Sequence, residues 1–300
     1  MTRKARAAAP GLERRIYTAE GKEHLPGELV RNEGGPPTGD AAADEAYDAI
    51  GLSYRFFKDV FGRNSIDGKG MPIDAVVHYG KNYPNAFWNG RQIIFGDGDG
   101  RIFQRFTIVP DVAAKQFANG VVSTSSSLVY WEQSGALMNA IAVILAVLCK
   151  QHANQQRVSE ADWVLARGIL YPHVKGSGIA SVAEPGTAYN DPNLLGVDSQ
   201  PVHMRGYTKT SDDAGGVHLN SGIPCKAFYL TATALGGYAW ERAGRIWYVT
   251  LRDRILKPNA RFADFARLTL RHAQKLYGAK SEEALAVRYG WEYVGVLKRS

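Results

Sequence analysis

The alternation of apolar and polar residues divides the chain into a β-rich first part and a helical second part. Residues 14–35 form short alternating runs on either side of Pro26-Gly27, which predicts two strands joined by a turn. Residues 40–61 carry apolar side chains at helical spacing and are predicted to form an amphipathic helix. The β-rich runs 75–79 and 91–95 then flank an aromatic turn, so the first third is predicted to be mainly strands with one helix.

Beyond residue 105 the spacing of apolar residues becomes helical. Helices are expected over residues 111–121, 134–152, 159–169, 223–242, 243–256 and 260–277. Residues 170–216 form a Gly/Pro/Asp-rich passage, which indicates a functional or ion-bound loop region. A strand-rich part followed by a helix-rich part predicts an α+β protein with two segregated lobes. We divide it into a basic flexible arm (1–14), an N-terminal α/β lobe ending in a central helix (15–122) and a helical C-terminal lobe (123–300).

Composition narrows the class of protein. With 300 residues, 45% of them hydrophobic, the chain can bury a sizeable core, and its longest apolar run (140–149) is shorter than the roughly 20 residues that cross a bilayer. The net charge of +7 comes from scattered Lys and Arg without a nucleic-acid motif, so neither a nucleic acid nor a membrane is expected as a partner. The basic N-terminus lacks the apolar region of a signal peptide, which predicts a cytoplasmic location or export by a non-classical route. Cys149 and Cys225 are expected to be buried free thiols.

The segment 111–121, DVAAKQFANGV, has the spacing of a metal site without its chemistry. On a helix, Lys115 and Asn119 lie one turn apart on one face, with Gln116 beside them. This is the spacing of His-Glu-x-x-His, in which two histidines hold zinc and the glutamate takes a proton from the bound water. The spacing alone leaves open an altered metal site or an ordinary helix.

Three other segments carry a family resemblance. Residues 77–100 (VHYGKNYPNAFWNGRQIIFGDGDG), 127–137 (SLVYWEQSGAL) and 212–230 (DDAGGVHLNSGIPCKAFYL) resemble the thermolysin family of neutral zinc metalloendopeptidases, and most of all its protealysin-like branch. The resemblance extends from about residue 15 to residue 294 in the family's order and spacing. It implies a thermolysin-like fold, with a mainly β N-terminal lobe, a helical C-terminal lobe and a central helix at a peptide cleft.

The resemblance also locates the family's zinc site on this chain. His-Glu-x-x-His falls on Lys115-Gln116-Phe117-Ala118-Asn119, and the third zinc ligand falls on Asn139. An ammonium has no lone pair to offer and amides are weak zinc ligands. Lys115 would also repel the ion, by about 4 kcal/mol per ion charge at roughly 4 Å and an effective dielectric near 20. The positions that should orient the histidines fall on Met138 and Val143, which carry no oxygen. These substitutions argue against zinc and against enzymatic activity.

Other functional positions are partly retained. Tyr130 and His218, with Asp213 to orient the histidine, match the groups that stabilise the transition state in the family, and Asn85 and Ala86 match its substrate-backbone pair. Without zinc, the simpler interpretation gives these residues structural or vestigial roles.

The family's calcium positions are also changed. Asp111 and Asp162 occupy two of these positions, whereas Lys150 and Arg167 stand where the family has further acids. The two cations argue against a double-calcium site, but the sequence still allows a single calcium ion.

The sequence therefore predicts a catalytically inactive, metal-free pseudoprotease. It would act by binding a peptide or protein in the residual cleft through Asn85, Ala86, Tyr130 and His218, and a proteinaceous inhibitor of active relatives is one such partner. The alternative is an active hydrolase of the metalloendopeptidase family that uses unusual chemistry or another metal. A thiol or hydroxyl nucleophile, from Cys225 or residues 123–127, is a weaker alternative because Cys225 falls at the start of a buried helix.

Overall fold

The first lobe is built on a five-stranded sheet. A computed structural model describes residues 11–298, and the order of the strands in its sheet is β2-β1-β3-β5-β4. The strands are β1 (Arg14–Thr18), β2 (Glu28–Asn32), β3 (Ile73–Val77), β4 (Ala86–Trp88) and β5 (Gln92–Phe95). β3 pairs in parallel with β1 and β5, whereas β2 and β4 are antiparallel edge strands. Within residues 11–298 β4 pairs only with β5, so its second edge can receive another extended chain.

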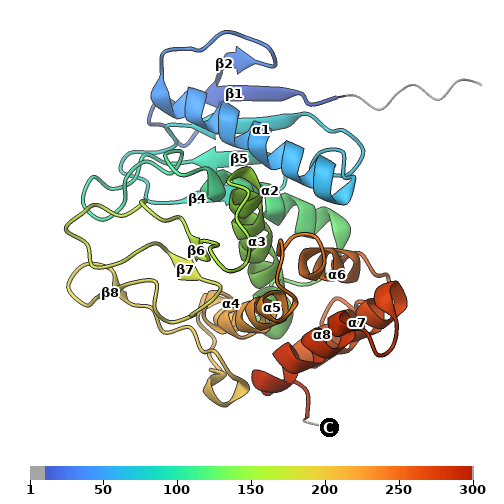
Figure 1. The fold of residues 1–300 in the computed structure, drawn as a ribbon. Coiled ribbons are helices and arrows are strands. Elements are labelled where there is room, and N and C mark those ends of the chain that lie inside the picture. The colour runs from blue at the N-terminus through green and yellow to red at the C-terminus, as the bar shows by residue number, and fades with distance from the viewer. Residues whose placement is uncertain (1–10, 299–300) are drawn as a thin grey trace, which may run out of the picture.

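Helix α1 (Ala41–Phe61) packs against this sheet (Figure 1). The Asp40 side chain caps the helix by accepting a hydrogen bond from the Ala42 N–H at 2.9 Å, and Gly62 ends it in the left-handed conformation (φ 64°). The predicted helix over 40–61 and the predicted strand pair over 14–35 are therefore confirmed.

Two central helices connect the lobes. α2 (Pro110–Ser125) and α3 (Glu132–Ala153) lie side by side, between the sheet above and the remaining helices below in Figure 1. Phe117 of α2 stacks on Phe57 of α1 with ring centroids 5.0 Å apart, which joins the central helix to the first lobe. α3 is long and apolar enough to cross a membrane, but it is mostly buried inside the protein, as a core helix is.

The second lobe is mainly helical. It contains α4 (Asp213–Asn220), α5 (Gly222–Leu235), α6 (Ala243–Leu251), α7 (Phe262–Tyr277) and α8 (Glu282–Tyr293). The passage before α4 holds only the two-residue strands β6 (Val164–Leu165), β7 (Ala180–Ser181), β8 (Asn190–Asp191) and β9 (Gly196–Val197), and the short 3-10 helix η1 (Met204–Gly206). Trp247 of α6 and Trp291 of α8 stack in the core, with ring centroids 5.9 Å apart. Cys149 and Cys225 are buried free thiols, as expected.

Several predicted elements differ from the structure. The helix expected over 159–169 is absent and its place is taken by turns and β6, because Ala166 (φ 57°) and Gly168 (φ 90°) adopt left-handed conformations and the Asp162 side chain binds the Val164 N–H. The helices expected over 223–242 and 243–256 end earlier, at Leu235 and Leu251, whereas α2 continues to Ser125. α8 was not predicted. Of the expected basic arm, residues 1–10 lie outside the described part of the chain, and β1 already begins at Arg14.

Candidate active site

Two adjoining cavities lie where β4 faces the central helices. Their volumes are about 370 and 380 Å³, and both are lined by Asn85, Lys115, Asn139 and His218. The first is also lined by Ala86, Gln116, Asn119 and Tyr130. The structure thus brings the predicted site residues together, with Asp213 bonded to His218.

Tyr130, His218 and Asp213 form a hydrogen-bonded array at one wall of the cavity. Asp213 Oδ1 lies 2.5 Å from His218 Nδ1, and His218 Nε2 lies 3.2 Å from the Tyr130 hydroxyl. The Asp213 carboxylate also accepts hydrogen bonds from the main-chain N–H groups of His218 and Leu219, at 2.6 and 3.2 Å. Asp213 itself has φ 51°, and this left-handed turn brings its carboxylate back over the histidine. The array therefore fixes both the orientation of the imidazole and the ring nitrogen that faces Tyr130.

Tyr130 remains a neutral hydrogen-bond donor. Burial, with a smaller contribution from the Asp213 charge, raises the pKa of Tyr130 to about 12. Its hydroxyl therefore keeps its proton throughout the physiological pH range.

The face of α2 that lines the cavity carries one amine and two amides. Asn119 Nδ2 donates to Gln116 Oε1 at 2.8 Å, so one hydrogen bond joins the two amides. Lys115 is partly buried, and its ammonium has no hydrogen bond or ion pair to any residue of the described chain. Burial without a compensating partner lowers the pKa of Lys115 to about 8.

Asn139 faces the start of α5. Its Nδ2 donates to Ser221 Oγ at 2.9 Å, and Ser221 Oγ donates to the His218 carbonyl at 2.7 Å. Gln200 Nε2 donates to the same carbonyl at 2.6 Å. Sequence reasoning missed Ser221 and Gln200. The position of Ser221, three residues after His218 at a helix start, is a usable signal, whereas Gln200 lies in an irregular passage without one.

The residues at the position of the family's zinc ion do not fit that ion. An ammonium and three amides, from Lys115, Gln116, Asn119 and Asn139, replace the imidazole and carboxylate groups that zinc requires. Within residues 11–298 no group of three or more His, Cys, Asp or Glu side chains could hold a metal ion. No step that involves zinc is therefore derived for this site.

The acidic residues near α2 are already bound to cations. Lys150 Nζ lies 3.0 Å from carboxylate oxygens of both Asp111 and Asp162. Arg167 forms two further hydrogen bonds to Asp162, each of 3.0 Å. Burial opposes ionisation of Asp162, but hydrogen bonds from Arg167, the Val164 N–H and Lys150 outweigh it and lower the pKa of Asp162 to about 2.

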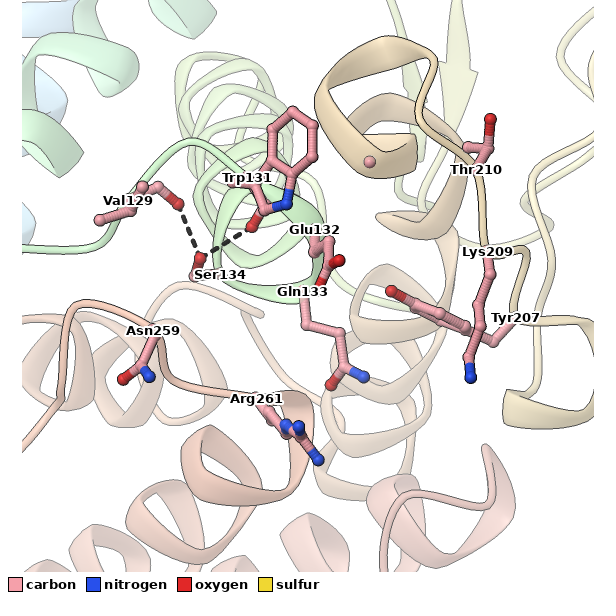
Figure 2. A pocket seen from close by; sticks show the side chains of 11 residues that line it. Val129, Trp131, Glu132, Gln133, Ser134, Tyr207, Lys209, Thr210, Asn259 and Arg261 are labelled. Carbon is pink, nitrogen blue, oxygen red and sulfur yellow. Dashed lines mark hydrogen bonds between the residues drawn. The ribbon is translucent and has the colours of Figure 1, made fainter.

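A further cavity of about 550 Å³ lies beside the start of α3, and it is larger than either cavity of the site. Figure 2 shows Glu132 and Gln133 on one side of it, with Tyr207 and Lys209 across from them. None of the predicted site residues lines this cavity, so its volume alone does not make it the active site.

Two family comparisons cover nearly the whole chain. The thermolysin metallopeptidase catalytic domain matches residues 7–123, and the thermolysin metallopeptidase alpha-helical domain matches residues 126–296. The chain belongs to the thermolysin metallopeptidase family. This confirms the family resemblance seen in the sequence.

Individual members of the thermolysin family are close in sequence and structure. The chain is 50% identical over 286 residues to an extracellular metalloprotease of Pectobacterium carotovorum subsp. carotovorum, covering 95% of this chain and 82% of that protein. It is 48% identical over 287 residues to protease PrtS of Photorhabdus sp. (strain Az29), covering 95% and 76%. The structure of the precursor of protealysin, a metalloproteinase from Serratia proteamaculans, matches with a TM-score of 0.94 and 50% identity, covering 97% of this chain and 89% of that one. The thermolysin-like α+β fold and the protealysin-like relationship are confirmed.

These relatives contradict other predictions made from the sequence. The inactive, metal-free pseudoprotease is not supported, because relatives that share about half of their residues with this chain are named as proteases or metalloproteases. The prediction of no metal cofactor is contradicted for the same reason. The predicted cytoplasmic location is contradicted by an extracellular relative and by the precursor form of another. The inference of inactivity rested on the replaced zinc ligands, the replaced general base and the apolar residues at the orienting positions. These replacements show that zinc is held poorly, but they do not decide whether the cleft acts on peptides.

Proposed function

We propose that the chain is a peptide hydrolase of the thermolysin family whose catalytic groups differ from His-Glu-x-x-His. The observation that supports it is the Tyr130–His218–Asp213 array, which faces the same cavity as the edge strand β4. An array of donors beside a free strand edge suits a peptide carbonyl that is held in an extended chain.

Strand β4 supplies the peptide-binding edge. Ala86, Phe87 and Trp88 line the cavity, and in the described part of the chain no other strand pairs with their second edge. Asn85 Oδ1 accepts a hydrogen bond from the Ala86 N–H at 2.8 Å, so the Asn85 side chain is folded back onto the start of this strand. An extended substrate would form main-chain hydrogen bonds along β4 and place one carbonyl near Tyr130 and His218.

Tyr130 and His218 would stabilise the negative charge that develops on that carbonyl oxygen. The Tyr130 hydroxyl is a neutral donor, and His218 Nε2 lies 3.2 Å from it. Asp213 holds the imidazole from the opposite side and fixes its orientation.

Lys115 would be the proton acceptor. With a pKa of about 8, about one tenth of this amine is neutral at pH 7. The neutral amine takes a proton from water, and the water oxygen forms a bond to the carbonyl carbon. The tetrahedral intermediate then collapses with cleavage of the C–N bond, and the Lys115 ammonium returns the proton to the leaving amine. The products are one amine and one carboxylic acid, which becomes a carboxylate by releasing its proton to solvent, and Lys115 is regenerated as the neutral amine.

The test is cleavage of internally quenched fluorescent peptides, with product masses identified and the metal content of the protein measured. Activity is assayed as purified, with added Zn²⁺ and with a chelator, so that metal-assisted hydrolysis is detected if it occurs. Lys115→Met and Tyr130→Phe are expected to lower kcat at least tenfold, whereas Lys280→Met and Tyr289→Phe, which alter exposed residues outside the cavity, leave it unchanged. Absence of cleavage under all three conditions, or equal residual rates in Lys115→Met and the wild type, would refute the proposal.

A further inference from the structure

The cavity beside Lys115 is rich in hydrogen-bond donors and almost free of negative charge. Among the residues that line the two adjoining cavities, Asp198 carries the only carboxylate. That carboxylate is buried and already accepts hydrogen bonds from the main-chain N–H groups of Gly186, Ala188 and Gln200, at 3.2, 3.1 and 3.2 Å. It is therefore not available as a partner for a cation in the cavity.

Lys115 differs from the other lysines that have little exposure to solvent. Lys226 Nζ lies 2.7 Å from the Ala183 carbonyl and 2.8 Å from Glu184 Oε1, and Lys150 lies between two carboxylates. Lys115 has no such partner in the described chain, although it lies on the α2 face shared by both cavities. Removing a cation from water without pairing it is unfavourable. An anion that enters the cavity would offset this cost by forming a charge-assisted hydrogen bond with the Lys115 ammonium.

The amides near Lys115 form no hydrogen bond with it in the described chain. Asn119 Nδ2 donates to Gln116 Oε1, and Asn139 Nδ2 donates to Ser221 Oγ. The Tyr130 hydroxyl and His218 Nε2, which lie 3.2 Å apart, line the same cavity as Lys115. An anion with two oxygens in this cavity therefore has both an ammonium and the Tyr130–His218 pair on its lining.

We infer that Lys115, together with Tyr130 and His218, forms a binding site for the carboxylate of a peptide. The peptide is indicated by the free edge of β4, which lines the same cavity and offers main-chain hydrogen bonds to an extended chain. This inference rests on the proposed function insofar as a peptide occupies the cleft, because hydrolysis leaves a new C-terminal carboxylate on the acyl half of the substrate. The same chemistry could come from a glutamate side chain, which the test distinguishes.

The experiment is calorimetric titration at pH 6.5 with three acetylated tetrapeptides that share their first three residues. The first ends in alanine with a free carboxylate, the second in alanine carboxamide, and the third in glutamate carboxamide. The wild type is expected to bind the first at least tenfold more tightly than the second. In Lys115→Met, which keeps an unbranched side chain one atom shorter and removes its charge, the two affinities are expected to become equal. Lys280→Met, an exposed lysine outside the cavity, keeps the discrimination.

These outcomes test the carboxylate site separately from the proposed hydrolase activity. Equal affinities for carboxylate and carboxamide in the wild type, or discrimination that persists in Lys115→Met, would overturn the carboxylate site even if peptides are cleaved. Discrimination without any cleavage would support the carboxylate site and refute the hydrolase alone. If the glutamate carboxamide binds as tightly as the free carboxylate, the site is supported and an acidic side chain is its ligand.

Discussion

Replacing Lys115 by methionine should stabilise the protein, although it removes a residue from the proposed active site. The lysine is partly buried and has no partner among residues 11–298, which lowers its pKa from 10.5 to about 8. At about 1.36 kcal/mol for each pH unit, this difference sets a ceiling of about 3.4 kcal/mol on the destabilisation by the ammonium. Because the side chain still meets water through the cavity, we expect Lys115→Met to raise the free energy of unfolding by about 1–2 kcal/mol at pH 7.

The stability gain expected for Lys115→Met depends on pH in a direction that follows from the lowered pKa of the lysine. A base with a lower pKa in the folded state destabilises that state fully below pH 8, where the group is charged in both states. The effect fades between pH 8 and 10.5, where first the folded and then the unfolded protein loses the proton. The gain from Lys115→Met should therefore be largest near pH 7 and small at pH 10.5.

The measurement is urea unfolding followed by tryptophan fluorescence, for wild type and variant at each pH. Lys150→Met is the matched control with the opposite expected sign, because its ammonium lies 3.0 Å from carboxylate oxygens of both Asp111 and Asp162. A Lys115→Met protein that is no more stable than the wild type at pH 7, or whose gain is the same at every pH, would refute the reasoning.

Three other substitutions test packing, the catalytic array and the acidic cluster. In Gly120→Ala the new Cβ would lie 2.6 Å from Ile66 Cγ2, so thermal unfolding should show a loss of about 1–3 kcal/mol. Asp213→Asn should lower kcat for peptide cleavage about 10²-fold with little change in KM, because it removes the carboxylate that holds His218. An unchanged kcat would show that the Asp213–His218 hydrogen bond has no role in catalysis. Asp162→Asn should lower the free energy of unfolding by about 1–2 kcal/mol at pH 7. The difference in unfolding free energy between variant and wild type should become smaller as pH falls from 4 towards 2, since the pKa of Asp162 is about 2. A difference that stays constant in this range would contradict that assignment.

Regular elements with strong local signals could be predicted from the sequence. Residues 40–61 have helical spacing, and the structure confirms the helix and shows Asp40 as its N-cap. The segment 159–169 also has helical spacing, but the hydrogen bonds of Asp162 and the left-handed conformation of Ala166 oppose the helix. Helix α8 was missed even though Ser281 caps it by accepting from the Ala284 N–H at 3.2 Å, because its apolar pattern is weak without knowledge of the tryptophan stack at Trp291.

The membership of the candidate site was predictable, whereas its electrostatics were not. The resemblance placed Asn85, Lys115, Tyr130 and His218 in one cleft, and they do line adjoining cavities. Asn139, for example, donates to Ser221, which lies far away in the sequence. Local spacing contains no information about such a contact. The reading of these residues as inactive went further than their chemistry warranted, because it took the loss of one donor set as the loss of function.

Lys115 Nζ is both the proposed proton acceptor and the cation of the proposed carboxylate site, so each role limits the other. A neutral amine that takes a proton from water becomes an ammonium as the adjacent carbonyl becomes a tetrahedral oxyanion. Since the described chain offers this ammonium no anion, the oxyanion is its partner until the proton passes to the leaving amine, and the product carboxylate pairs with Lys115 once the amine is protonated again. Methionine at this position would remove the base and the counter-ion together. An arginine would keep only the counter-ion, because its guanidinium does not lose a proton near neutral pH. Carboxylate binding that survives in Lys115→Arg without cleavage would thus separate the two roles.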